Sequence, residues 1–153
     1  QIKLSNERKE KMSVNYFESK ESKERAVFIL ESYDCPDLLK EQSDAFALDE
    51  FIDNYNWDDG LETPYFILNH RNCELGTALK IFYLGEGIAM VQVDYTNHKL
   101  GHWVEFIEYT FKRIVEGNYK SKYIAFKFPL MERSKQRIKE AGWPKVFIED
   151  IVV

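Results

Sequence analysis

Apolar residues recur at helical spacing along most of the chain, and this pattern predicts a mainly helical fold. Residues 1–25 are dense in charge and are interpreted as a charged N-terminal helix. Further helices are expected at residues 36–55, 65–70, 72–84, 88–95, 103–114 and 130–141, although the short run at 88–95 also fits a strand. Residues 123–128 alternate like a strand, and residues 146–153 are a second strand candidate. The expected fold is mainly α, a helical bundle of about six to seven helices, with a small C-terminal β pair as an addition.

A turn interrupts the helical pattern at Asn56-Trp57-Asp58-Asp59-Gly60, because Asp-Gly is a strong turn signal. We expect Trp57 to hold this loop against the core, and Gly60 to end it. Pro64 suits the first position of the next helix, with Thr63 as its N-cap. Trp57, Gly60 and Pro64 are therefore predicted to have structural roles.

The length and composition fit one globular domain that spans residues 1–153. The chain is 44% hydrophobic and has only seven Gly and four Pro, which is typical of a packed protein. No apolar run reaches the roughly 18 to 20 residues of a membrane span, so we expect a cytoplasmic protein. The first residue is Gln1 rather than Met, which leaves open whether residues precede it. Cys35 and Cys73 are too few for a disulfide framework and are interpreted as buried thiols.

Charge is distributed unevenly along the chain. Residues 31–62 carry eleven acidic side chains against Lys40 alone, whereas residues 112–145 carry ten basic side chains against three acidic ones. These segments are either two solvated faces or neighbours in the fold, or else the first is an acidic surface that attracts a basic partner. The overall charge of −5 argues against direct binding of nucleic acid. The acidic residues that such a surface would use are Asp37, Glu41, Asp44, Asp53, Asp58, Asp59 and Glu62.

Two groups of residues could carry chemistry. His98 and His102 are four residues apart, as two metal ligands on one helical face would be, but the glutamate of a H-E-x-x-H motif is missing. Asp58, Asp59 and Glu62 could hold a cation, yet their spacing does not fit a calcium loop, and aspartates in a turn usually bond to backbone N–H groups. No nucleophile or phosphate-loop motif is present. We therefore predict no catalytic residue, no metal and no cofactor.

The chain resembles a bacterial domain family of unknown function with the signature N-W-D-D-G followed by T-A-L-x-x-F. The first part lies within Asn54-Tyr55-Asn56-Trp57-Asp58-Asp59-Gly60 and the second is Thr77-Ala78-Leu79 with Phe82. The other positions that match are Pro64, Cys73, Gly117, Tyr119 and Ile124. The resemblance covers residues 45–128, which leaves residues 129–153 as a basic C-terminal extension. It implies a helix-rich cytosolic protein without an assigned reaction, and some members resemble immunity proteins of polymorphic toxin systems.

Three hypotheses follow. The first is an immunity protein that neutralises a cognate toxin, such as a basic nuclease, by direct binding through the acidic residues. The second is a metal-dependent hydrolase that uses Asp58, Asp59, His98 or His102. The third is a structural subunit that forms a homodimer through exposed aromatic residues such as Trp103 or Trp143.

Overall fold

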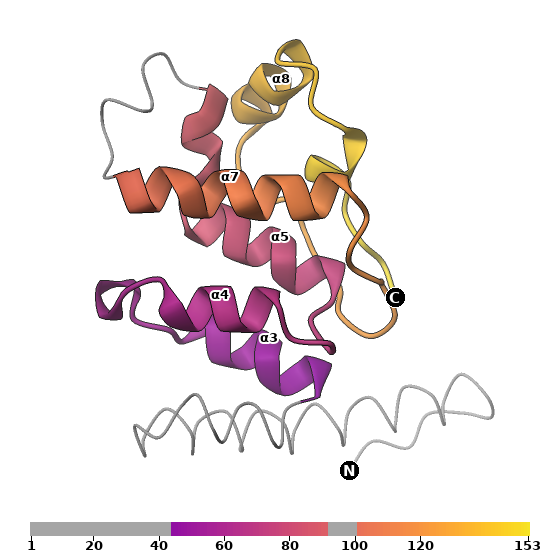
Figure 1. Ribbon diagram of the computed structural model, residues 1–153. Helices are drawn as coiled ribbons and strands as arrows, with labels where there is room; N and C mark the ends of the chain where they lie inside the picture. Colours follow the sequence, from indigo (N-terminus) through magenta and orange to yellow (C-terminus); the bar gives the residue numbers. More distant parts are fainter. Residues whose placement is uncertain (1–43, 92–100) are drawn as a thin grey trace, which may run out of the picture.

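The computed structural model describes residues 44–91 and 101–153, and these residues are mainly helical (Figure 1). The α-helices are α3 (Ala45–Asp53), α4 (Glu62–Leu68), α5 (Leu75–Leu84), α7 (Gly101–Val115) and α8 (Glu132–Glu140), and the 3-10 helices are η1 (Trp57–Asp59), η2 (Gly87–Val91) and η3 (Lys145–Phe147). No helix in these two ranges is long and apolar enough to cross a membrane. The helix expected at residues 1–25 lies outside the described residues, as do residues 36–43 and 92–95 of two other expected helices.

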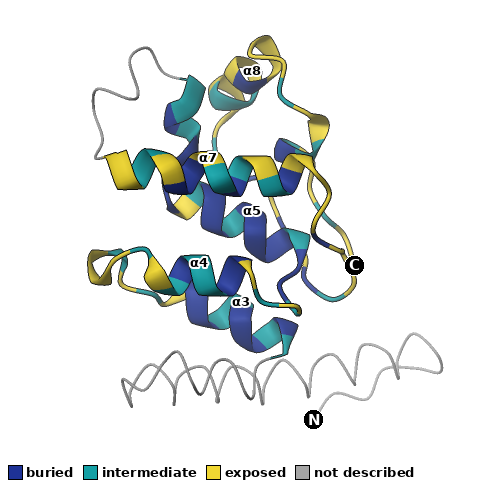
Figure 2. Ribbon diagram, viewed as in Figure 1, coloured by how far each residue is buried: buried dark blue, intermediate teal, exposed yellow. Residues whose placement is uncertain are grey.

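Helix α5 lies at the centre of the molecule. It contacts α3 and α4 on one side and α7, which crosses it, on the other (Figure 1). Its sequence is apolar almost all round, and six of its ten residues are buried. Figure 2 shows most of α5 in the colour of buried residues, whereas α7 alternates among buried, intermediate and exposed positions. The amphipathic pattern of residues 103–114 therefore places one face of α7 on α5.

One cluster of buried side chains runs through the described residues. It begins with Leu48 and Phe51 on α3 and ends with Ile138 and Phe147 near the C-terminus. Ring contacts connect Phe82 and Phe111 to Trp143 and Phe147, with centroids 4.7 to 5.7 Å apart. The C-terminal segment, residues 129–153, thus contributes two fully buried side chains to the common core, Ile138 and Phe147.

The expected C-terminal β pair is not found among the described residues. In the described residues, Phe126 and Ile151 form an isolated antiparallel bridge, with N···O distances of 3.1 and 2.7 Å. The ladder stops on one side because the Phe128 N–H donates to the Asp150 carboxylate at 2.8 Å instead of to a backbone carbonyl. Residues 146 and 147, which were expected to begin the second strand, belong to η3 instead.

Helix number and helix starts also differ from expectation. The described residues contain five α-helices, against the six to seven expected for the whole chain. α4 begins at Glu62, so Pro64 occupies its third position rather than its first. α5 begins after Glu74, which occupies its N-cap position, so Asn72 lies two residues too early to cap it. The Asn72 N–H donates to His70 Nδ1 at 3.0 Å within the preceding turn. α3 is capped by the Asp44 carboxylate, which accepts the Ala47 N–H at 2.9 Å.

Candidate functional site

The turn between α3 and α4 is built from short local contacts. The Asn56 side chain accepts the Asp58 N–H at 3.1 Å, and the Tyr55 hydroxyl donates to the Gly60 carbonyl at 2.8 Å. Gly60 has a φ of 101°, which a residue with a Cβ rarely adopts. The side chain that caps this turn is thus Asn56, whereas Asp58 and Asp59 were expected to bond to the backbone N–H groups. Asp58 and Asp59 are exposed, and Figure 2 shows this turn largely in the colour of exposed residues.

The half-buried Trp57 ring fastens the turn to the rest of the molecule. It meets Tyr55 and Phe106 edge-on, with centroids 5.7 and 6.2 Å apart. A Cβ on Gly85 would lie 3.6 Å from the same ring. The tryptophan therefore rests on α5 and α7, which holds the two neighbouring aspartates at a fixed place on the surface.

Helices α4 and α7 add carboxylates to the same side. Glu62 is exposed in the first turn of α4, where a negative charge is favourable to the helix dipole. Tyr65, one turn further, packs edge-on against Phe106 with centroids 4.9 Å apart. Burial and then the charge of Glu105, an exposed residue of α7, raise the pKa of Tyr65. We call Asp58, Asp59, Glu62 and Glu105 the acidic edge.

The other acidic residues expected at the surface have separate roles. Asp44 caps α3, and Asp53 forms an ion pair with Lys80 of α5 at 2.9 Å. Asp37 and Glu41 lie outside the described residues. Of the seven acidic residues that were expected at the surface, Asp58, Asp59 and Glu62 are thus the ones that are exposed and form no ion pair with another described residue.

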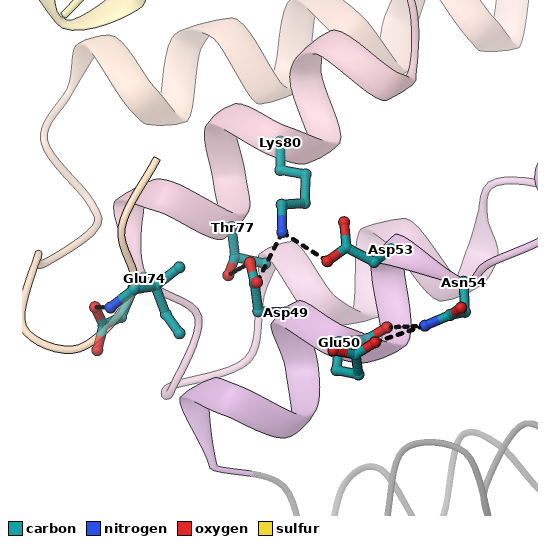
Figure 3. Close-up of polar contacts among 8 residues, drawn as sticks. Asp49, Glu50, Asp53, Asn54, Glu74, Thr77 and Lys80 are labelled. Carbon is teal, nitrogen blue, oxygen red and sulfur yellow. Dashed lines mark hydrogen bonds and ion pairs between the residues drawn. The ribbon is translucent and has the colours of Figure 1, made fainter. Parts of the chain in front are cut away.

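A polar cluster joins α3 to α5 (Figure 3). The Asp49 carboxylate accepts the Thr77 hydroxyl and the Lys80 ammonium, both at 2.7 Å. Burial raises the pKa of Asp49, although Lys80 partly offsets this effect. Burial also disfavours the charged form of Lys80, but the two aspartates outweigh it and leave the Lys80 pKa raised. The sequence analysis did not predict this cluster, because Asp49 is far from Thr77 and Lys80 in the sequence. The contacts hold α3 against α5.

Glu74 is a second buried acid that sequence reasoning missed. Its side chain accepts the N–H groups of Lys122, Tyr123 and Ile124 at 2.8, 2.8 and 3.0 Å with a single oxygen. Figure 3 shows it at the start of α5, beside the later loop. The residue is only 6% exposed. Glu74 thus fastens the chain after α7 to the first turn of α5.

The residues proposed for metal binding do not gather in the described part of the chain. His102 is exposed in the first turn of α7, and His98 lies outside the described residues. Among the residues that are described, no group of three or more His, Cys, Asp or Glu side chains could hold a metal ion. Cys73 is buried, and burial raises the pKa of its thiol, which disfavours the nucleophilic thiolate. Cys35 lies outside the described residues.

The aromatic residues suggested for a homodimer are not fully exposed. Trp103 and Trp143 are both half-buried. Trp143 packs against Phe111 and Phe147, with centroids 5.0 and 5.2 Å apart. These side chains belong to the molecule's own packing.

Comparison with known proteins gives one match. Residues 43–115 match the model of a family described as a domain of unknown function (DUF4274). The matched range contains the turn, the polar cluster and α3 to α7 as described above. No curated protein matches the chain, and no solved structure does.

Proposed function

We propose that this protein is a non-enzymatic binding module that recognises a basic protein surface through the acidic edge. The observation that carries the proposal is that Asp58 and Asp59 are exposed on a turn held by a side-chain cap, a tyrosine hydrogen bond and the Trp57 ring. A rigid surface loses little conformational freedom on binding, which favours affinity. Clustered charges of one sign also raise the association rate with an oppositely charged partner.

The charges of the acidic edge are also available to a partner. Unlike Asp49 and Asp53, which bind Lys80, the edge carboxylates form no ion pair with another described residue. Glu105 comes from α7, so the edge is supported by two packed helices as well as by the turn. A partner with clustered Lys or Arg side chains fits this arrangement.

We further propose that the partner is a cognate toxin domain, and that the chain acts as its immunity protein in the cytoplasm. The support is the resemblance of the N-W-D-D-G and T-A-L-x-x-F segments to a family with such members, together with the charge of the edge. A basic nuclease is the toxin class whose surface charge would match. Inhibition by direct binding needs no catalytic group on this chain.

The test is co-expression of the tagged chain with the product of the neighbouring gene, followed by measurement of association rates. We expect a stoichiometric complex whose association slows as salt is raised, because exposed charges are screened beyond about 8 to 10 Å at 0.1 to 0.15 M salt. At low salt, a double variant Asp58→Asn/Asp59→Asn should bind roughly tenfold more slowly. The control Glu116→Gln/Glu149→Gln removes two exposed charges elsewhere and should bind at close to the normal rate.

Either of two results would contradict the proposal. If the two double variants associate at the same rate, the acidic edge is not the interface. If the complex forms equally fast at low and high salt, electrostatic attraction does not drive recognition.

A further inference from the structure

A cavity of about 510 Å³ lies on the other side of the molecule from the acidic edge. Three segments form its walls: the start of α3, residues 71–74 before α5, and residues 118–123 after α7. Figure 1 shows the starts of α3 and α5 and the loop after α7 on one side, and the turn that holds η1 on the other. Its volume is within the range of about 300 to 1,000 Å³ that is usual for small-molecule sites.

The cavity is lined by three cationic side chains. Arg71, Lys120 and Lys122 are exposed, and they come from two different walls. None of them forms an ion pair with another described residue. The ion pairs between residues of the described ranges are those of Lys80 with Asp49 and Asp53. An arginine offers a planar fork of donors that suits a phosphate group, and lysines add point charges.

The two acids in the lining already have donors of their own. Glu74 accepts three backbone N–H groups, and Asp44 accepts the first-turn N–H of Ala47 in α3. Hydrogen bonds of this kind offset the negative charge locally. Arg71, Lys120 and Lys122, which form no ion pair with another described residue, therefore dominate the electrostatic potential that a ligand in the cavity would meet.

Next to the cations lies an aromatic surface. The Phe46 and Tyr123 rings contact each other with centroids 5.6 Å apart, and both side chains line the cavity. Lys122 Nζ lies 4.9 Å from the centre of the Tyr123 ring. A ligand that places its anionic group among the cations would thus lay its remaining part against aromatic rings.

The backbone that carries these groups is held in place. The turn before α5 is closed by a 3.0 Å bond from the Cys73 N–H to the His70 carbonyl. On the opposite wall, the Lys120 carbonyl accepts the Leu75 N–H at 2.8 Å, and Glu74 binds the Lys122 N–H. The two walls are therefore fixed relative to each other, and a ligand would not have to order them.

We propose that this cavity binds a small phosphorylated aromatic ligand, with the chemistry of a nucleoside monophosphate. The phosphate lies among Arg71, Lys120 and Lys122, and the planar group lies against Phe46 and Tyr123. Base stacking on aromatic side chains is favourable for every base, so this surface is not expected to select one base strongly. The site is separate from the acidic edge and does not depend on the function proposed there.

The test is titration of the ¹⁵N-labelled full chain with adenosine 5′-monophosphate, adenosine and inorganic phosphate, followed by NMR and by calorimetry. We expect the monophosphate to shift the amide signals of residues 71–74 and 118–123 and to bind more tightly than adenosine or inorganic phosphate. Arg71→Ala and Lys122→Ala should each raise its Kd roughly tenfold or more, because each removes a charge-assisted contact. Lys139→Ala, an exposed cation on α8 outside the cavity, should leave the Kd unchanged.

Four outcomes would overturn the proposal. Absence of any shift at millimolar monophosphate excludes the site. Equal affinity for adenosine and its monophosphate refutes the role of the cations, and equal affinity for inorganic phosphate refutes the role of the rings. An equal effect of Lys139→Ala and Arg71→Ala shows attraction by overall charge rather than binding in the cavity.

Discussion

Glu74 gives the sharpest test of how the loop after α7 is held. Its carboxylate accepts three backbone N–H groups at 2.8 to 3.0 Å while the residue is 6% exposed. Replacing it by alanine leaves three donors without their acceptor. The Ile124 N–H is buried and cannot reach water easily, whereas the neighbouring amides belong to residues that are more exposed.

The magnitude follows from these contacts. A hydrogen bond to a charged group contributes about 1.5 to 3 kcal/mol, and a buried orphan donor costs about 1 to 3 kcal/mol. The three bonds share one oxygen, and the variant no longer buries a charge, so the contributions do not add fully. We expect Glu74→Ala to lower the free energy of unfolding by about 3 to 5 kcal/mol, out of a usual total of about 5 to 15 kcal/mol. Glu74→Gln keeps an acceptor oxygen and should lose only about 1 to 2 kcal/mol.

Urea unfolding at neutral pH, followed by circular dichroism, measures these differences. Glu149→Ala removes an exposed carboxylate and should change stability by less than about 0.5 kcal/mol. The reasoning is refuted if Glu74→Ala unfolds at the same urea concentration as Glu149→Ala, because the three bonds would then contribute nothing net.

Three further predictions concern the core, the polar cluster and alkaline pH. Gly87→Ala should lower the free energy of unfolding by about 1 to 3 kcal/mol, because a Cβ at this position would lie 2.4 Å from the buried Phe82 ring. Urea unfolding measures this change, and a variant with the same unfolding midpoint as the unmodified protein would contradict the prediction. A double-mutant cycle of Asp49→Asn and Lys80→Met should give a coupling of about 1 kcal/mol, and additive effects would show that the pair is not coupled. Burial raises the pKa of Tyr119 from 10.0 to about 12, so the unfolded chain loses this proton first and stability should fall as pH rises through this range. Stability measured between pH 9 and 12 should fall less steeply in Tyr119→Phe, and an identical slope contradicts the assignment.

Helical periodicity identified the amphipathic elements well because burial itself sets that pattern. The stripe of residues 103–114 became the buried face of α7, and Leu75 to Tyr83 became α5. Helix starts were less predictable. Thr63-Pro64 is a favourable start by local chemistry, yet α4 begins at Glu62 directly after the turn.

The alternation of residues 123–128 predicted burial but not hydrogen bonding. Ile124, Phe126 and Phe128 are buried and the residues between them are less so, as in a strand. The pattern does not specify which group accepts each N–H, and here Asp150 takes the place of a backbone carbonyl. Long-range pairs raise the same difficulty, since neither Lys80 with Asp49 nor Glu74 with the loop after α7 leaves a local signal in the sequence. The turn at Trp57 was visible because Asp59-Gly60 is a turn signal that lies within a few adjacent residues.

The aromatic contacts near the C-terminus bear on where this protein can be cut. The family match ends at residue 115, but Phe82 and Phe111 inside it are covered by Trp143 and Phe147 from outside it. The Tyr83 hydroxyl also donates to the Phe147 carbonyl at 2.6 Å. A fragment trimmed to the matched residues would therefore present bare rings to water and tend to aggregate, so the smallest useful fragment for expression has to keep residues 116–153.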